Sequence, residues 1–297
     1  MILSSSIAKL TSAFGIETAI EMMSKAGFDG MDFMFGHKYC NPDTDSDEFK
    51  THFLKMRALA EDKGIPFIQA HAYGPSSHAD PERNQMLRDC IIRSIRNASY
   101  LGIPKVVVHP VQHLKYFEIG VPEQLFEMNV EFYNSLKPYC EEYNVQVAVE
   151  NMWQYRGRKI VHSTCSRPEE FNRYLDALDS RWFIGCLDIG HAFLVCEDID
   201  TFIEKMGADR LKCLHLHDVD GIIDNHTLPY YGAIEWNRVM KALAKIGYQG
   251  ELNYEAGGFL ASLPTDLYQT GIQYMADIGR YLIKKFDEYS AEFAQNK

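Results

Sequence analysis

The sequence predicts an α/β protein with the architecture of a (β/α)8 barrel, or TIM barrel. Short apolar runs alternate with longer amphipathic stretches, which is typical of a parallel sheet whose strands are joined by helices. Eight such units fit the 297 residues at roughly 37 residues each, and eight parallel units close into a barrel. No linker or low-complexity stretch divides the chain, so we expect a single domain over residues 1–297.

The strands are expected where short apolar runs are bounded by polar or turn-forming residues. In chain order they are Ile2–Ser5, Gly30–Met34, Ile65–His71, Lys105–His109, Val145–Glu150, Trp182–Asp188, Leu211–His217 and Glu251–Glu255.

The helices are expected in the amphipathic stretches between these strands. They are Glu17–Ala26, Asp47–Lys63, Pro81–Leu101, Glu123–Tyr143, Arg167–Leu178, Asp198–Met206, Trp236–Ile246 and Thr265–Phe286. Gly27, Gly64, Gly102 and Gly247 follow four of these stretches. Glycine adopts the left-handed conformation that ends a helix at little steric cost, so these positions support the helix ends.

An open, doubly wound sheet is the alternative architecture for alternating strands and helices. Such a sheet usually carries a glycine-rich phosphate loop after its first strand. Residues 4–9 read Ser-Ser-Ser-Ile-Ala-Lys and contain no glycine. This difference favours the barrel.

Composition limits the classes of partner. Hydrophobic residues make up 46% and charged residues 24% of the chain, as in ordinary globular proteins, which excludes a disordered or collagen-like chain. The 30 Lys and Arg residues and 41 Asp and Glu residues give a net charge of −11. Proteins that bind duplex DNA usually carry a basic excess. We therefore expect a small-molecule substrate and no nucleic-acid partner.

The cysteines and the hydropathy pattern predict a cytoplasmic protein. The seven cysteines are an odd number and no two have CxxC spacing, which indicates reduced thiols. The first residues lack the basic and apolar regions of a signal peptide. No run of about 18 apolar residues occurs, so no membrane-spanning segment is expected.

Polar residues stand at the carboxyl ends of six of the eight expected strands. They are His71, His109, Glu150, Asp188, the pair His215 and His217, and Glu255. In a barrel the active site lies at this end, because the loops after the strands converge there. The sequence therefore predicts that these side chains meet at one opening of the barrel.

The alternation of side chains along a strand agrees with this prediction. If Glu150 points into the barrel, Ala148 also does, while Val147 and Val149 face the helices. The same inward assignment places Asp188, His215 and Glu255 inside and leaves their apolar neighbours outside. His217 has the same parity as His215, so both histidines are expected to point inward.

Carboxylates and imidazoles crowded at one opening would repel one another or remain unsatisfied without a cation. Two Glu, one Asp and one His are suitable ligands for a divalent metal ion. We therefore expect one bound ion. The carboxylates favour Mn²⁺ or Mg²⁺, and additional imidazoles favour Co²⁺ or Zn²⁺.

The motifs around these residues resemble those of the xylose isomerase-like TIM barrel superfamily. The motifs are His71-Ala-Tyr, Val-Val-Val-His109-Pro, Val-Glu150-Asn, Leu-Asp188-Ile-Gly-His191-Ala, Leu-His215-Leu-His217-Asp218, Asp224-Asn-His226 and Glu255. The resemblance extends from Ile2 to about Phe286. The superfamily contains sugar phosphate isomerases and epimerases, ketose 3-epimerases, inosose dehydratases and isomerases, and endonuclease IV of AP endonuclease family 2.

The resemblance implies a ligand set for the epimerase branch. There a single metal is held by a Glu, an Asp, a His and a second Glu, and by motif these are Glu150, Asp188, His215 and Glu255. His217 is the alternative for the third ligand. The substrate-contacting histidine that follows the Asp in this branch matches His191.

The endonuclease branch is the second reading of the resemblance. Its members hold three zinc ions through nine residues, and all nine residue types are present here. The matching positions are His71, His109, Glu150, Asp188, His191, His215, Asp224, His226 and Glu255. That branch typically has Asn-Asp after the strand-seven histidine and Arg near its Asp-x-His. This chain has Leu-His217-Asp218 and Asp224-Asn-His226, which is similar to the sugar isomerase branch.

The expected function is a divalent-metal-dependent sugar or sugar phosphate isomerase or epimerase. Glu150 and Glu255 are the expected catalytic residues, which move a proton next to a carbonyl through an enediolate. The expected substrate-binding residues are His71, His109, Trp153, His191, His217, Asp224 and His226. Trp153 has two equal interpretations. Its ring forms an apolar wall against the sugar, or it packs within its loop without contacting the substrate.

Three alternatives remain at this point. They are an endonuclease IV-like zinc phosphodiesterase acting on abasic DNA, an inosose dehydratase-type lyase that shares the enolate step, and a barrel that binds a sugar or polyol-derived ligand without turnover. The resemblance also implies a homodimer or a homotetramer.

Overall fold

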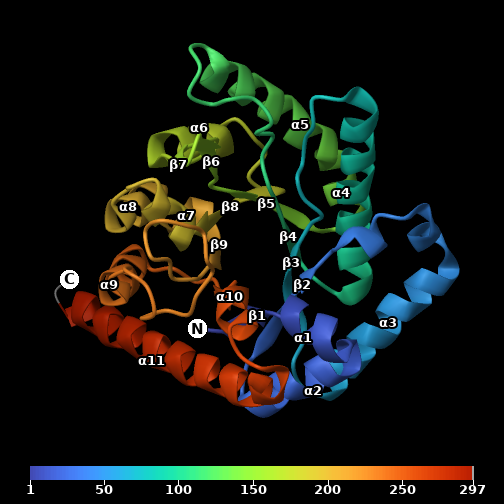
Figure 1. Ribbon diagram of the computed structural model, residues 1–297, viewed down its shortest axis with the longest axis vertical. Coiled ribbons are helices and arrows are strands. Elements are labelled where there is room, and N and C mark those ends of the chain that lie inside the picture. The colour runs from blue at the N-terminus through green and yellow to red at the C-terminus, as the bar shows by residue number, and fades with distance from the viewer. Residues whose placement is uncertain (296–297) are drawn as a thin grey trace.

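The computed structural model describes residues 1–295, and in it eight parallel strands form a barrel enclosed by helices (Figure 1). The strand order is β10-β1-β2-β3-β4-β5-β8-β9. The strands are β1 (Leu3–Ser6), β2 (Gly30–Met34), β3 (Phe67–His71), β4 (Lys105–Val108), β5 (Gln146–Glu150), β8 (Phe183–Asp188), β9 (Leu211–His215) and β10 (Leu252–Tyr254). The predicted TIM barrel is therefore confirmed.

The barrel is completed where β9 meets β10. A parallel bridge joins Leu216 to Tyr254 just after β9 ends. The Leu216 amide donates to the Asn253 carbonyl at 2.8 Å, and the Glu255 amide donates to the Leu216 carbonyl at 3.0 Å. These two bonds connect the chain after β9 to the chain at β10, the two edges that an open sheet would leave unpaired. The open-sheet alternative is therefore wrong for this chain.

The predicted helices are all present around the barrel. They are α2 (Ile16–Ala26), α3 (Asp47–Asp62), α4 (Pro81–Leu101), α5 (Val121–Tyr143), α6 (Pro168–Asp176), α8 (Ile199–Arg210), α9 (Trp236–Ile246) and α11 (Tyr268–Gln295). Gly27, Gly102 and Gly247 have positive φ angles of 82°, 76° and 69° and end their helices in the left-handed conformation. The last helix continues to Gln295, beyond its predicted end at Phe286.

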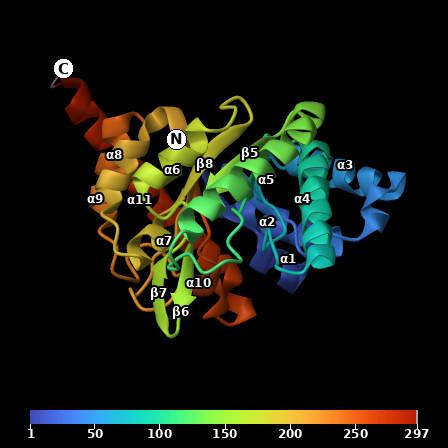
Figure 2. The same ribbon diagram turned by 90° about the horizontal axis from the view of Figure 1, so that it is seen from above.

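Short elements were not predicted. They are α1 (Ala8–Phe14), α7 (Ile189–Leu194), α10 (Gly257–Ala261), the 3-10 turns η1 (His37–Tyr39), η2 (Pro42–Asp45) and η3 (Thr265–Leu267), and the hairpin of β6 (Trp153–Arg156) and β7 (Lys159–His162). The hairpin extends away from the barrel in Figure 2. These elements are too short for hydrophobic periodicity to distinguish them from loops.

The alternation of inward and outward side chains is also confirmed. Val107, Ala148, Ile184, Cys186 and Cys213 form a small buried cluster that is separate from the main hydrophobic core. The outward residues of the same strands belong to the main core, between the sheet and the helices; examples are Val147, Leu187, Leu214 and Tyr254. The two cysteines therefore fill the barrel below the polar opening.

Among residues 1–295, no helix combines the length and apolar character needed to cross a bilayer.

A buried ion pair lies at the opposite end of the barrel from the polar cluster. Lys105 begins β4, and its Nζ lies 2.6 Å from Oε2 of Glu251, with side chains 14% and 6% exposed. We expect Lys105→Met to lower the free energy of unfolding by about 3 kcal/mol, since it leaves a buried carboxylate without its partner. Urea unfolding measures this loss.

The double variant Lys105→Met/Glu251→Leu is the control, because it removes both charges together. It is expected to regain part of the lost stability. Equal stabilities for the wild type and the single variant would contradict the structural importance of the pair.

Candidate metal centre

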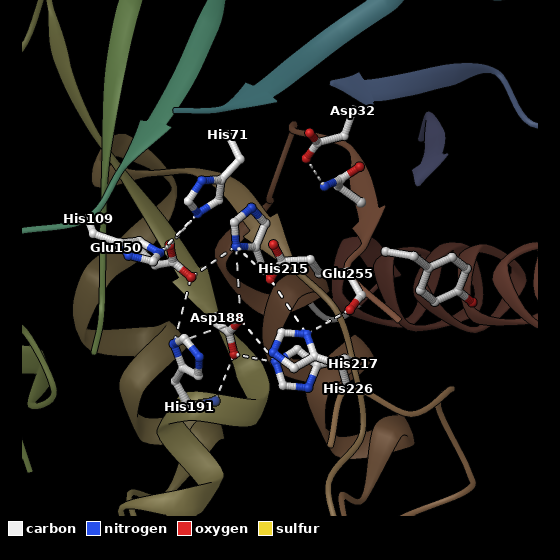
Figure 3. A network of polar contacts seen from close by, with 12 residues as sticks. Asp32, His71, His109, Glu150, Asp188, His191, His215, His217, His226 and Glu255 are labelled. Carbon is white, nitrogen blue, oxygen red and sulfur yellow. Dashed lines mark hydrogen bonds and ion pairs between the residues drawn. The ribbon is translucent and has the colours of Figure 1, made fainter. Parts of the chain in front are cut away.

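The polar residues at the strand ends and in the segments that follow them form three groups, and within each group one ligand atom per residue lies within 4.8 Å of the others. Figure 3 shows most of these side chains pointing toward one another. The central group is Glu150, Asp188, His215 and Glu255. A second group is His71, His109 and Glu150, and a third is His191, His217, Asp224 and His226. Glu150 belongs to the first two groups, and Asp188 of the central group contacts His191 and His217 of the third, so the three groups form one continuous cluster.

The central group contains His215 and not His217. His215 Nδ1 lies 3.0 Å from Glu150 Oε1, 3.5 Å from Glu255 Oε2 and 3.9 Å from Asp188 Oδ2. His217 Nε2 lies 3.0 Å from Asp188 Oδ1 and 3.8 Å from Asp224 Oδ1, and the His217 ring stacks on His226 with ring centroids 3.9 Å apart. Both histidines point inward and lie near Asp188. His215 also faces Glu150 and Glu255, whereas His217 also faces Asp224.

Asp188 connects the central group to the third group through the short helix α7. Asp188 ends β8 and caps α7, since its Oδ1 accepts a hydrogen bond from the His191 amide at 2.7 Å. Asn151 accepts from the Asp188 amide and donates to the Asp188 carbonyl, at 2.7 and 2.9 Å. A helix that starts directly at the strand end therefore places His191 beside the carboxylates.

A glycine makes room for this arrangement. A Cβ atom at Gly190 would collide with the imidazole of His217. The Gly in Asp188-Ile-Gly-His191 is thus explained by the close approach of His217, which follows β9, to α7.

In three histidines the ring nitrogen Nδ1 contacts a backbone carbonyl, which fixes the orientation of the ring. His71 Nδ1 lies 2.7 Å from the Ala72 carbonyl, His191 Nδ1 lies 2.9 Å from the Asn151 carbonyl, and His226 Nδ1 lies 2.8 Å from the Glu255 carbonyl. An imidazole that donates from Nδ1 and is otherwise neutral carries a lone pair on Nε2. This is the arrangement that second-shell groups give to metal-binding histidines.

The Nε2 atoms of these histidines face other electron-rich atoms. His71 Nε2 lies 2.9 Å from His109 Nε2, and the Nε2 atoms of both His191 and His226 lie 3.2 Å from Asp224 Oδ2. Lone pairs at such distances need a proton or a cation between them. The donor set therefore fits divalent metal ions.

Buried atoms without partners support the same conclusion. Glu150 Oε2, His217 Nδ1 and Asp224 Oδ1 are buried and make no hydrogen bond within the protein. Buried polar atoms in folded proteins are usually satisfied. Metal ions at this cluster would satisfy the carboxylate oxygens and neutralise their charges.

Without metal, the histidines and carboxylates influence each other's protonation. Burial raises the pKa of Glu150, but the imidazoles of His215 and His109 outweigh burial and hold this pKa well below the usual value. Burial lowers the pKa of His191, but Asp188 and Asp224 outweigh it and raise the pKa to about 10. Protons and metal ions therefore compete for the same positions.

The cluster forms one wall of a cavity of about 590 Å³. The cavity is lined by the expected site residues His71, His109, Glu150, Trp153, His191, Asp224, His226 and Glu255. Sequence reasoning missed other lining residues, among them Phe35, Tyr73, Gln112 and Met152. These lie in loops, or just beyond a strand, and no periodic pattern indicates them.

Trp153 has a definite place in the cavity wall. It starts the β6–β7 hairpin, and its Nε1 donates to Asp224 Oδ2 at 3.2 Å. Asp188, His215 and His217 differ from the other site residues, since all three are fully buried and none of them lines the cavity.

Asp218 positions the loop that carries Asp224 and His226, and sequence reasoning gave it no role. Its Oδ1 accepts from the Val219 and Ile234 amides at 2.9 and 3.1 Å. Its Oδ2 accepts from the Tyr230 amide at 3.0 Å and from Trp236 Nε1 at 2.8 Å. A buried carboxylate with four donors fixes both ends of this loop.

Comparison with known proteins places this architecture in a family. Residues 20–278 match the family model described as "Xylose isomerase-like TIM barrel". The chain belongs to this family. The match includes every residue of the three ligand groups, so the candidate metal centre lies within the family region.

Two relatives are similar to this chain in sequence. The uncharacterised protein y4fM of Sinorhizobium fredii is 31% identical to this chain over 199 residues. The match covers 66% of this chain and 61% of y4fM, so the chain spans less than two thirds of the length of that relative. Fructoselysine 3-epimerase of Shigella flexneri is 24% identical over 246 residues, 79% of this chain and 83% of that enzyme.

A solved structure, described as that of a D-tagatose 3-epimerase-like protein, aligns with a TM-score of 0.72. The alignment covers 99% of this chain and 100% of that chain at 22% identity. At this identity the likeness establishes the fold alone, and the activity must be argued from the site.

Replacing Asp218 tests its role in positioning the third ligand group. We expect Asp218→Ala to lower the free energy of unfolding by about 3 kcal/mol, because four buried donors lose a charged acceptor. We also expect faster proteolytic cleavage of the loop that carries Asp224 and His226, because this loop loses the carboxylate that orders it. Denaturant unfolding and limited proteolysis of the purified variant measure the two effects.

Asp220→Ala is the matched control. Asp220 lies in the same loop but is exposed, and it accepts only from the Ile222 and Ile223 amides. It is expected to change neither measurement by a comparable amount. If both variants behaved alike, Asp218 would have no special role in ordering the loop.

Proposed function

We propose that this protein is a divalent-metal-dependent sugar isomerase or epimerase that moves a proton at a carbon next to a carbonyl group. The observation that carries the proposal is the cavity of about 590 Å³ in which Glu150 and Glu255 line the wall together with several imidazoles. This volume is in the usual range for small-molecule sites. Two carboxylates beside a cation site suit reversible proton transfer.

The metal would be held by Glu150, Asp188, His215 and Glu255, the central group of the cluster. When bound, the divalent ion supplies a Lewis acid that polarises the substrate carbonyl and stabilises negative charge on its oxygen. The mixed oxygen and nitrogen donors are compatible with Mn²⁺, Mg²⁺, Co²⁺ or Zn²⁺.

Glu150 and Glu255 would exchange the proton with the substrate. Glu150 ends β5 and Glu255 follows β10, so the two carboxylates approach the cavity from different strands of the barrel. The low pKa of Glu150 keeps it deprotonated but makes it a weak base, so a general-base role requires a loose contact with the metal. Return of the proton to the opposite face of the same carbon gives an epimer, and return to the neighbouring carbon gives an isomer.

The remaining cavity residues would bind and orient the sugar. His71, His109, His191 and His226 line the cavity, so their rings would lie against the hydroxyl groups of the sugar. Trp153 offers an apolar face, as is common in carbohydrate sites, while its Nε1 holds Asp224. His217 is covered by its neighbours, so it would position Asp188 and Asp224 rather than contact the substrate.

A zinc phosphodiesterase acting on abasic DNA is the second candidate. It is favoured by the three ligand groups, which together contain all nine residues that the resemblance assigns to a three-zinc site. The net charge of −11 and the small volume of the cavity favour a small molecule instead. An inosose dehydratase-type lyase would use the same proton abstraction and is distinguished by its product.

The activity is tested by incubating metal-loaded protein with ketoses, aldoses and inososes in D2O and following products and deuterium incorporation by NMR. We expect turnover with deuterium exchange next to the carbonyl. Glu150→Gln and Glu255→Gln are each expected to lower the rate by about 100-fold to 10,000-fold, because each removes a proton acceptor.

Metal content of both variants is measured alongside, so that loss of the ion and loss of the base are separated. Glu118→Gln, an exposed glutamate in the loop after β4, is the control and should retain the wild-type rate. Wild-type rates in either active-site variant would disprove the mechanism.

Metal stoichiometry separates the two candidate functions. We expect about one tightly bound ion per chain, an unchanged count in Asp224→Ala, and a large loss in Asp188→Ala, since only Asp188 belongs to the central group. Inductively coupled plasma analysis of the purified proteins gives these counts. Three tightly bound zinc ions together with cleavage of an abasic-site duplex would identify the phosphodiesterase.

A further inference from the structure

A second cavity of about 420 Å³ lies outside the metal centre, against the helices α4 and α5. Its lining comes from α4, α5 and the loops that follow β3 and β4 (Figure 1). Val111, Met128 and Phe132 provide apolar surface. Ser76, Arg88 and His113 provide polar surface, and none of the residues that line this cavity belongs to the three ligand groups.

Three of the residues that line this cavity each have a buried polar side-chain atom without a hydrogen-bond partner. The three atoms are Ser76 Oγ, Arg88 Nε and His113 Nδ1. Ser76 is only 4% exposed, so solvent does not satisfy its hydroxyl group. Unsatisfied buried polar atoms are costly, and three around one cavity indicate a missing polar ligand.

The positive charge of the Arg88 guanidinium indicates that such a ligand is an anion. Within residues 1–295, Arg88 makes no hydrogen bond or ion pair, whereas other arginines of α4 do: Arg93 and Arg96 both contact Asp45. A partly buried guanidinium favours a carboxylate or phosphate, which matches its planar donors. Glu131, the acidic residue of the lining, is exposed and marks the rim.

The second cavity shares two loops with the metal-centre cavity. In the loop after β3, Tyr73 lines the metal cavity and Ser76 lines the second one. In the loop after β4, Gln112 lines the metal cavity and His113 lines the second one. The Gln112 amide donates to Ser77 Oγ at 3.3 Å and connects the loops. A ligand in one cavity therefore contacts segments that form the wall of the other.

We propose that this second cavity binds the anionic group of a small molecule, a carboxylate or a phosphate, through Arg88 and Ser76. The apolar side chains of Met128 and Phe132 would cover the organic part of the same molecule. The anion belongs either to a distal end of the substrate or to a separate effector. The shared loops make both sources able to influence the metal centre.

The binding test uses metal-loaded full-length protein and inorganic phosphate. Titration is followed by calorimetry and by the side-chain NMR signal of Arg88 Nε. We expect saturable binding that shifts this signal, and an affinity lower by about tenfold or more in Arg88→Met, since a charged hydrogen-bond donor is removed. Phosphate bound at the metal centre would remain in this variant.

Arg83→Met is the matched control, because Arg83 is an exposed residue of the same helix and does not line the cavity. Ser76→Ala provides a second variant with minimal change of volume, and it is expected to weaken binding about fivefold. Binding that is equal in the wild type, Arg88→Met and Ser76→Ala, or an unshifted Arg88 signal, would overturn the proposal. This measurement does not depend on turnover, so it stands apart from the proposed function.

Kinetics distinguish the two sources of the anion. If the anion belongs to the substrate, a ketose phosphate has a lower KM than the matching ketose, and Arg88→Met removes this difference. If it belongs to an effector, inorganic phosphate changes the KM of the unphosphorylated ketose in the wild type and not in Arg88→Met. Either result supports the cavity, and the absence of any Arg88-dependent effect in binding and kinetics contradicts it.

Discussion

The concentration of negative charge at one opening of the barrel is the constraint on which the candidate site depends. Glu150, Asp188 and Glu255 converge on His215, and Asp224 lies nearby among three more histidines. Because parallel strands deliver their carboxyl ends to the same place, the barrel brings together groups that would otherwise repel one another. Protons or cations must neutralise this charge, and this requirement is the physical basis of the proposed metal site.

The surrounding protein is arranged so that the histidines present their lone pairs to that opening. Backbone carbonyls contact the Nδ1 atoms of His71, His191 and His226. Helix α7 is capped by Asp188, whose carboxylate accepts from the His191 amide and so keeps His191 beside it. Asp218 orders the loop with Asp224 and His226 through four donors. These supporting contacts come from backbone groups and from residues that never reach the cavity, and they give the cluster its fixed geometry before any ligand binds.

The family fold supports more than one chemistry, so the surroundings of the cluster must decide between them. The full set of nine residues is compatible with a multinuclear centre, whereas the net charge of −11 and the cavity of about 590 Å³ favour the proposed small-molecule substrate. The second cavity adds a further distinction, since its unpaired Arg88 suits an anionic group at a position outside the metal cluster. Both cavities are lined in part by the loops after β3 and β4, so a change in either loop would affect the proposed ligands of both.

The sequence by itself determined the barrel and the inward direction of Glu150, Asp188, His215 and Glu255, because regular alternation along strands is a local property that residue order records. It also located His71 and His109 at neighbouring strand ends. Only the tertiary structure separated His215 from His217, since both have the same parity and differ in which carboxylates they meet across the barrel. The hairpin with Trp153, the Asp218 network and the cavity around Arg88 likewise depend on contacts between loops, which follow no period and therefore leave no pattern in the sequence.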